Sequence, residues 1–307
     1  MKDLLNDIKF NCDISDAGYW GHFSICGLLM RYRDLFRSEQ GLEPWDHISR
    51  EDIAAWIGGK EERWAGLEGR SFRDLPVKGT SCSPFDLDAI NRAVRNSGLV
   101  YGAGYGMYCK PTFFLATVRS TEVIDGHTVH TTERELVRDL FTSPAMLQGH
   151  TIFLRLEPLK ALLWDKFAEI RSGRRHALDI AYRSYGISPG QSADSGFGKK
   201  LEEMARSFLR VLLHHELAES HETVPQWKDL VMHAGDRKVE LFLRAVQDLV
   251  ADTSDSGPIR AITDSRDQGA LSLFIGLLDG FRRHLFPEIR DAYGRLLQHG
   301  SWEAIEE

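Results

Sequence analysis

The stretch from Leu201 to Glu222 constrains the fold most, because its apolar residues recur at the spacing of an α-helix. At ~100° per residue, the apolar positions of its first half fall on one side and the charged positions fall on the other. This pattern predicts a long amphipathic helix whose apolar side packs on a core. The apolar positions are Leu201, Met204, Ala205, Phe208, Val211 and Leu212.

The end of this stretch, which reads HHELAESHE, breaks the pattern. The same angular count turns His215, Glu219 and Glu222 along the apolar side, toward the interior. A buried carboxylate without a partner is costly in free energy. The two glutamates therefore need a compensating charge, which either an arginine or a metal ion would provide.

A metal ion suits these residue types, because imidazole and carboxylate groups on facing helices bind iron or manganese in helical bundles. We therefore treat His215, Glu219 and Glu222 as candidate ligands of iron or manganese. The spacing lacks the Glu-x-x-His pair of those bundles and the second histidine of His-Glu-x-x-His zinc proteases. In the alternative interpretation, the helix reaches the surface here, and its glutamates are solvated or paired with arginines.

A later stretch could complete the site. The nearly apolar segment from Ala270 to Phe286 predicts a central buried helix, with His284 near its end and Glu288 just beyond Pro287. If this helix runs parallel to residues 201–222, His284 and Glu288 approach the His/Glu cluster; if it runs antiparallel, they lie far from it. His284 could equally be a surface histidine near a helix C-terminus, where positive charge is favoured.

The stretch from Lys238 to Ala251 predicts a conventional surface helix. Its apolar side should face the core, while Glu240, Arg244 and Asp248 should form i, i+4 pairs on the outside. These acids are therefore not expected to bind a metal. The apolar positions are Val239, Phe242, Leu243, Val246, Leu249 and Val250.

The first part of the chain predicts helices followed by a small antiparallel sheet over about residues 99–132. Asp125 and Gly126 separate two β-rich runs and form a strong signal for a two-residue hairpin turn. Thr132 with Glu135 three residues later matches a capping box, which predicts a return to helix. The preceding helices are expected over residues 22–39, 49–57 and 83–96.

The glycines at positions 102, 104 and 106 do not form a dinucleotide fingerprint, because their intervals are wrong and they lead into more strand. They are better explained by a backbone or large side chain that approaches the strand closely. No nucleotide cofactor is indicated.

The sequence predicts an α+β fold that is predominantly α-helical, with a small antiparallel sheet in the N-terminal part and a bundle-like helical C-terminal part. Residues 187–197, which read ISPGQSADSGF, have the composition of a linker. We therefore expect one region over residues 1–186, which carries the sheet, and another over residues 187–307, which carries the His/Glu-rich helix.

The composition argues against two classes of partner. The net charge of -7 does not favour nucleic-acid binding. The sequence contains neither an apolar run of membrane-spanning length nor a signal peptide, so we expect no membrane association and a cytoplasmic location.

Three stretches resemble an uncharacterised bacterial protein family: NCDISDA at residues 11–17, SICGLLMRYRDLFRSEQGLEPW at residues 24–45, and FPEI at residues 286–289. The resemblance covers most of the chain. It implies a bacterial cytoplasmic protein and transfers neither an activity nor a site.

Three functions are compatible with these patterns. The first is a non-haem iron or manganese enzyme. The second is a non-catalytic helical protein that binds a partner, in which the His/Glu cluster is surface charge or a set of structural ion pairs. The third is a metal-free enzyme that uses one of the glutamates as a general acid or base. No motif specifies the small-molecule or protein partner, or the oligomeric state. The candidate metal ligands are His215, Glu219, Glu222, His284 and Glu288.

Overall fold

The computed structural model describes residues 2–77, 79–171, 176–221 and 226–306 of the 307-residue chain. The chain forms two compact units, residues 1–161 and residues 162–307, and the division falls inside helix α5 (Leu156–Arg171). The predicted α+β fold with a predominance of helices is confirmed. The predicted domain boundary after residue 186 stays a prediction, because a compact unit need not be a domain that folds alone.

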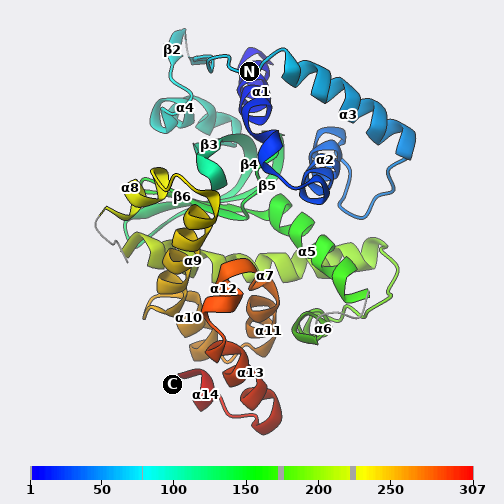
Figure 1. Ribbon diagram of the computed structural model, residues 1–307, viewed down its shortest axis with the longest axis vertical. Helices are drawn as coiled ribbons and strands as arrows, with labels where there is room; N and C mark the ends of the chain where they lie inside the picture. Colours follow the sequence, from blue (N-terminus) through cyan, green and yellow to red (C-terminus); the bar gives the residue numbers. More distant parts are fainter. Residues whose placement is uncertain (1, 78, 172–175, 222–225, 307) are drawn as a thin grey trace. The chain divides into compact units, whose positions relative to one another are not determined.

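Four main helices of the N-terminal unit pack beside a sheet and on one another (Figure 1). Ser24, Ser49 and Asp86 each accept a hydrogen bond from the first turn of the helix that follows. One helix was predicted to end at Gly58 and Gly59 but continues through both, so its predicted end was wrong. The helices are α1 (Lys2–Tyr19), α2 (Ile25–Gln40), α3 (Arg50–Ala65) and α4 (Leu87–Val94), with 3-10 turns η1 (Trp20–His22), η2 (Arg95–Ser97) and η3 (Met107–Cys109).

The sheet of this unit has five strands in the order β3-β4-β5-β7-β6. Its pairs are antiparallel except for β5 and β7, which run parallel, so the sheet is mixed. The predicted hairpin is confirmed, since Asp125 and Gly126 both adopt positive φ between β4 and β5, as a type I′ turn requires. The strands are β3 (Leu99–Tyr105), β4 (Pro111–Ile124), β5 (His127–Arg138), β6 (Ala145–Gln148) and β7 (Thr151–Arg155); β1 (Leu75–Val77) and β2 (Thr80–Cys82) form a separate hairpin.

The helix predicted from Thr132 and Glu135 does not form, because both residues lie in β5. The hydroxyl of Thr132 donates to the carbonyl of Leu154, and the carboxylate of Glu135 binds Arg155 Nε at 2.6 Å. The two side chains are therefore held by the neighbouring strand β7 and not by a helix start. Pairing of β5 with β4 and β7 outweighs the local capping signal.

The glycines of β3 serve close packing, as predicted. A Cβ on Gly102 would overlap the ring of Phe114, and one on Gly104 would overlap the amide of Gln148. The sheet thus has side chains packed against the backbone of its edge strand.

Apolar side chains cover both faces of this sheet. One face packs on α1 and α4 through Tyr101, Phe113 and Leu115, while the other carries Phe114 and Phe153. The alternation follows from the two-residue period of a strand.

The C-terminal unit is helical, and several of its helices pack against α7 (Figure 1). The apolar stripe of α7 is buried as predicted, except for Leu212, which is half-buried. The predicted central helix over residues 270–286 is instead two helices, because Leu278 is extended and Gly280 has a positive φ. The helices after α5 are α6 (His176–Ser184), α7 (Ser195–His221), α8 (Trp227–Met232), α9 (Arg237–Thr253), α10 (Pro258–Ser265), α11 (Gln268–Leu277), α12 (Gly280–Leu285), α13 (Glu288–His299) and α14 (Glu303–Glu306).

Helix α9 faces the opposite way from the sequence prediction. Glu240 and Asp252 are buried at 6% and 1% exposure, whereas Val239, Phe242 and Val250 are 46%, 41% and 39% exposed. The acidic side therefore packs inward, while three positions of the apolar stripe are exposed and the other three are half-buried, namely Leu243, Val246 and Leu249. Asp252 binds His215 of α7 and Arg282 of α12, which explains why it faces inward. The predicted i, i+4 pair of Glu240 and Arg244 does form, at 2.8 Å, but Glu240 is buried.

Among the described residues, none of the helices combines the length and the apolarity that a bilayer crossing demands.

Candidate metal centre

Three acidic and imidazole side chains gather on the last turns of α7. His215, Glu216 and Glu219 each offer one donor atom, and these atoms all lie within 4.8 Å of one another. The spacing explains the grouping, because residues three and four apart on a helix lie on the same side. Two of the three residues were predicted from the sequence, and Glu216 was missed.

Asp252 on α9 fixes the imidazole of His215. Its Oδ1 lies 2.8 Å from His215 Nδ1, and the Asp252 carboxylate is almost fully buried. Burial alone would lower the pKa of His215, but the hydrogen bond and the charge of Asp252 raise it to about 9. At neutral pH the unliganded imidazole is therefore protonated on both nitrogens and positively charged.

Arg282 on α12 holds the other side of the same carboxylate. Its Nη2 lies 2.5 Å from Asp252 Oδ2, and its Nη1 lies 3.8 Å from Asp248 Oδ2. Burial works against the charged guanidinium, yet Asp252 and Asp248 raise the pKa of Arg282. The two oxygens of Asp252 thus bind His215 and Arg282. Asp252 therefore orients these two side chains, and a ligand would be bound by the oxygens of other residues.

Asp248 and Glu219 lie on the other side of the imidazole. Asp248 Oδ1 is 4.0 Å from His215 Nε2, and Glu219 Oε1 accepts a hydrogen bond of 2.6 Å from the amide of Gln247. Burial is the largest cause that raises the pKa of each of these two carboxyl groups. The cations His215 and Arg244 lower the pKa of both carboxyl groups, but not enough to offset their burial.

The remaining predicted ligands do not join this group within the described part of the chain. Glu222 lies outside the described residues, so its position stays a prediction. His284 on α12 and Glu288 at the start of α13 are both exposed. Their coordination of a metal also stays a prediction.

Sequence reasoning missed Asp248, Asp252 and Arg282, which complete the cluster. Asp248 and Asp252 are four residues apart, and Glu240 and Arg244 lie on the same side of α9. This acidic row was visible in the sequence, but it was assigned to the solvent side because the apolar stripe was expected to face the core.

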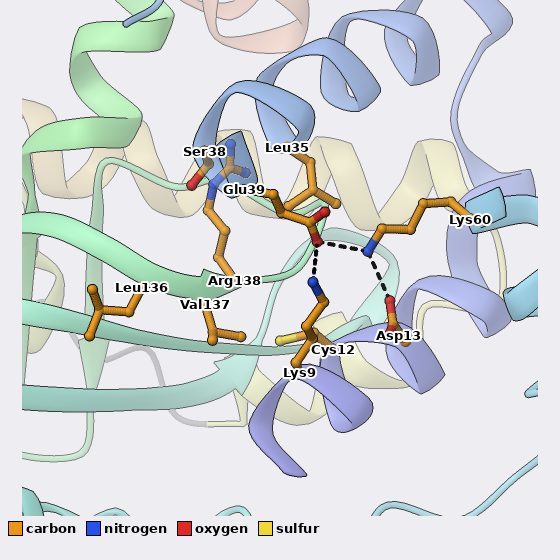
Figure 2. Close-up of a pocket in the computed structure, with 10 residues that line it drawn as sticks. All are labelled: Lys9, Cys12, Asp13, Leu35, Ser38, Glu39, Lys60, Leu136, Val137 and Arg138. Atoms are coloured by element: carbon orange, nitrogen blue, oxygen red, sulfur yellow. Dashed lines mark hydrogen bonds and ion pairs between the residues drawn. The ribbon is translucent and has the colours of Figure 1, made fainter. Parts of the chain in front are cut away.

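A second polar cluster lies in the N-terminal unit, beside a small cavity of about 30 Å³ (Figure 2). Lys60 of α3 reaches between Asp13 of α1 and Glu39 of α2, with Nζ to oxygen distances of 3.0 and 2.9 Å. Lys9 also binds Glu39 at 3.1 Å, as the dashed lines in Figure 2 show. Such a cavity holds about one or two waters, so this cluster ties three helices together and offers little room for a substrate.

A third cluster surrounds Lys110, whose Nζ lies 2.7 Å from the hydroxyl of Ser15. The same Nζ lies 3.0 Å from Asp16 and 3.3 Å from Asp139, and the four side chains are buried. Burial raises the pKa of Asp16 to about 7, whereas the two aspartates raise the pKa of Lys110 above its usual value despite burial. The hydroxyl of Ser15 also donates to the carbonyl of Pro111, so this cluster joins α1 to the start of β4.

Comparison with known proteins covers both halves of the chain. The model of the family of unknown function (DUF6866) N-terminal domain matches residues 3–155, and that of the corresponding C-terminal domain matches residues 160–307. Neither the curated proteins nor the solved structures include a match to this chain.

Proposed function

The chain belongs to the DUF6866 family through both of its domains, and from the geometry of its His/Glu cluster we propose that it is a metal-dependent enzyme. The proposed ligands of one divalent ion are His215, Glu216 and Glu219, with Asp248 as a fourth donor. The family description names no activity, so the proposal rests on the site.

One observation carries the proposal: Asp252 binds Nδ1 of His215 and leaves Nε2 free of a hydrogen bond from that residue, 4.0 Å from Asp248 Oδ1. Histidine ligands in metalloproteins commonly donate their second ring N–H to a carboxylate, which fixes the tautomer and the ring orientation. Arg282 in turn anchors Asp252. The imidazole is therefore oriented by two further groups, as a ligand needs to be.

The donor distances suit a small divalent ion. Three atoms at the corners of a triangle with sides of 4.8 Å lie about 2.8 Å from its centre, so a contraction of roughly 0.7 Å reaches the ~2.1 Å that nitrogen and oxygen ligands require. Side-chain rotation provides such a contraction. One imidazole with several carboxylates favours manganese or iron, and zinc is the competitor. A metal there would polarise a substrate oxygen or activate a bound water.

The charge balance favours the same conclusion. The carboxylates of Glu219, Asp248 and Asp252 lie near the guanidinium of Arg282 and the imidazole of His215, and the guanidinium of Arg244, which binds Glu240, also acts on Glu219 and Asp248. Replacement of the imidazole proton by a dication adds one positive charge where carboxyl pKa values are raised. Metal binding should therefore strengthen as the pH rises toward 9 and release a proton.

Metal content and affinity test the proposal. The protein is purified without added metal, analysed for iron, manganese and zinc, stripped with chelator, and titrated with Mn²⁺. We expect one ion per chain, and at least a tenfold loss of affinity in His215→Ala and Glu219→Gln, which remove a donor or its charge.

The matched control is His214→Ala, which removes the neighbouring histidine of the same helix without touching the donor group. It should bind Mn²⁺ like the wild type. Equal affinity in all four proteins, or no binding by the wild type, would contradict the proposal.

A metal-free acid–base function is the second candidate, and the raised pKa of Glu219 supports it. The two candidates differ in one respect. A wild type that binds no metal, with Glu219 titrating near neutral pH in NMR spectra, would favour the metal-free function.

A further inference from the structure

Helix α9 exposes an apolar stripe that the fold of its own unit leaves uncovered, and we propose that this stripe packs against the same stripe of a second copy of the chain. Val239, Phe242 and Val250 are each more than a third exposed, although they are apolar. The three are aligned along one side of α9, opposite its buried acids. We call this side the α9 stripe.

The spacing of the α9 stripe is that of a helix–helix seam. Val239, Phe242, Val246 and Leu249 alternate at intervals of three and four residues, which is the a/d pattern of paired helices. At ~1.5 Å per residue the 17-residue α9 is about 25 Å long. This pattern indicates that the α9 stripe binds another helix with an apolar stripe, and it argues against a small-molecule ligand.

Neighbouring helices widen the apolar surface on both sides. Phe281 of α12 packs edge-on against Phe242, with ring centroids 5.7 Å apart, and Leu285 of the same helix is 40% exposed. Leu230 on α8, which packs on α9, is 52% exposed. Exposed apolar residues that gather on adjacent helices indicate an interaction surface, unlike single scattered ones.

Symmetry and charge favour a second copy as the occupant. In a two-fold contact each copy presents the same surface, and a two-fold axis perpendicular to α9, which is the arrangement we propose, makes the two helices antiparallel. The exposed Lys238 at the start of one α9 then approaches the end of the other, where Asp255 is exposed and the helix dipole is negative. The stripe is therefore complementary to itself.

Sedimentation or light scattering over a range of concentrations tests the proposal, which does not depend on metal binding. We expect a reversible dimer of the full chain, and Phe242→Glu should weaken dimerisation at least tenfold. The matched control is Val123→Glu, which places the same charge on an apolar residue that is 75% exposed in the N-terminal unit. It should dimerise like the wild type.

Exchanging the charges of Lys238 and Asp255 tests the contact without disturbing the fold, because both side chains are exposed. Lys238→Glu alone should weaken the dimer, and Asp255→Lys in the same chain should restore it. A monomer at every concentration, or a dimer that Phe242→Glu and Lys238→Glu leave unchanged, would overturn the proposal.

Discussion

The polar clusters of the two units differ in how their charges are balanced. In the N-terminal unit, Lys60 lies between Asp13 and Glu39, and Lys9 adds a second cation to Glu39. In the C-terminal unit, the carboxylate of Glu219 receives its hydrogen bond from the neutral amide of Gln247. The two glutamates therefore differ in their partners: Glu39 binds two lysines, whereas Glu219 accepts from a neutral group.

The pKa values of two glutamates express this difference. Burial raises the pKa of both carboxyl groups, but Lys60 more than offsets it at Glu39, whose pKa is lowered. At Glu219 burial prevails and the pKa is raised. Glu39 and Glu219 thus shift in opposite directions, because Glu39 binds two lysines directly and is less buried, whereas at Glu219 the cations His215 and Arg244 do not offset burial.

Loss of Lys60 should have the largest effect on stability. Lys60→Met leaves Asp13 and Glu39 without their shared cation in a mostly buried place, and the cost should be about 3–5 kcal/mol of unfolding free energy. Urea denaturation measures it. Lys9→Met, at a side chain that is 43% exposed, is the control and should cost less than about 1 kcal/mol. Equal losses of unfolding free energy in the two variants would contradict the view that buried Lys60 contributes more than exposed Lys9.

The metal-free C-terminal unit should lose stability as the pH rises. The pKa of His215 is raised from 6.5 to about 9 in the folded protein, so its contribution is complete below pH 6.5 and is lost as the pH passes 9. The loss should amount to at most roughly 3 kcal/mol. Denaturation in the presence of chelator between pH 6.5 and 9.5 measures it, and His215→Gln should flatten the profile. An unchanged profile in this variant would contradict the ion pair with Asp252.

Neutralising the two contrasting glutamates should have smaller effects of opposite sign. Glu39→Gln removes a carboxylate that two lysines stabilise and should cost about 1–2 kcal/mol. Glu219→Gln removes a carboxylate whose ionisation the fold disfavours, so without metal it should stabilise the protein by up to about 1 kcal/mol. Thermal melting at pH 7.5 in chelator compares them. Shifts of the same sign would mean that the clusters do not differ in charge balance.

Much of the fold follows from patterns that act locally. The 3.6-residue period of Leu201 to Val211 predicts the buried side of α7, and Asp125-Gly126 predicts the hairpin because both residues tolerate positive φ. The end of β5 could not be predicted in this way. Its Thr132 and Glu135 find partners in β7, about twenty residues later, and a capping signal within four residues carries no information about them.

Only the α7 residues of the candidate site could be predicted from the sequence. The angular count identifies His215 and Glu219, but it cannot identify Asp252 and Arg282, because these reach the site through the packing of α9 and α12. The orientation of α9 was predicted wrongly for the same reason. A hydrophobic stripe predicts the buried side only where the neighbouring helices are apolar, and here they offer a histidine and an arginine to its acids.

The proton balance of metal binding tests most directly whether the C-terminal cluster holds a cation. Mn²⁺ is titrated into the chelator-treated protein at pH 7.5, and calorimetry in two buffers of different ionisation enthalpy gives the protons released. Because the pKa of His215 is about 9 without metal, we expect about one proton per ion bound, and none in His215→Ala. Binding that releases no proton, or that His215→Ala leaves unchanged, would contradict coordination by this imidazole.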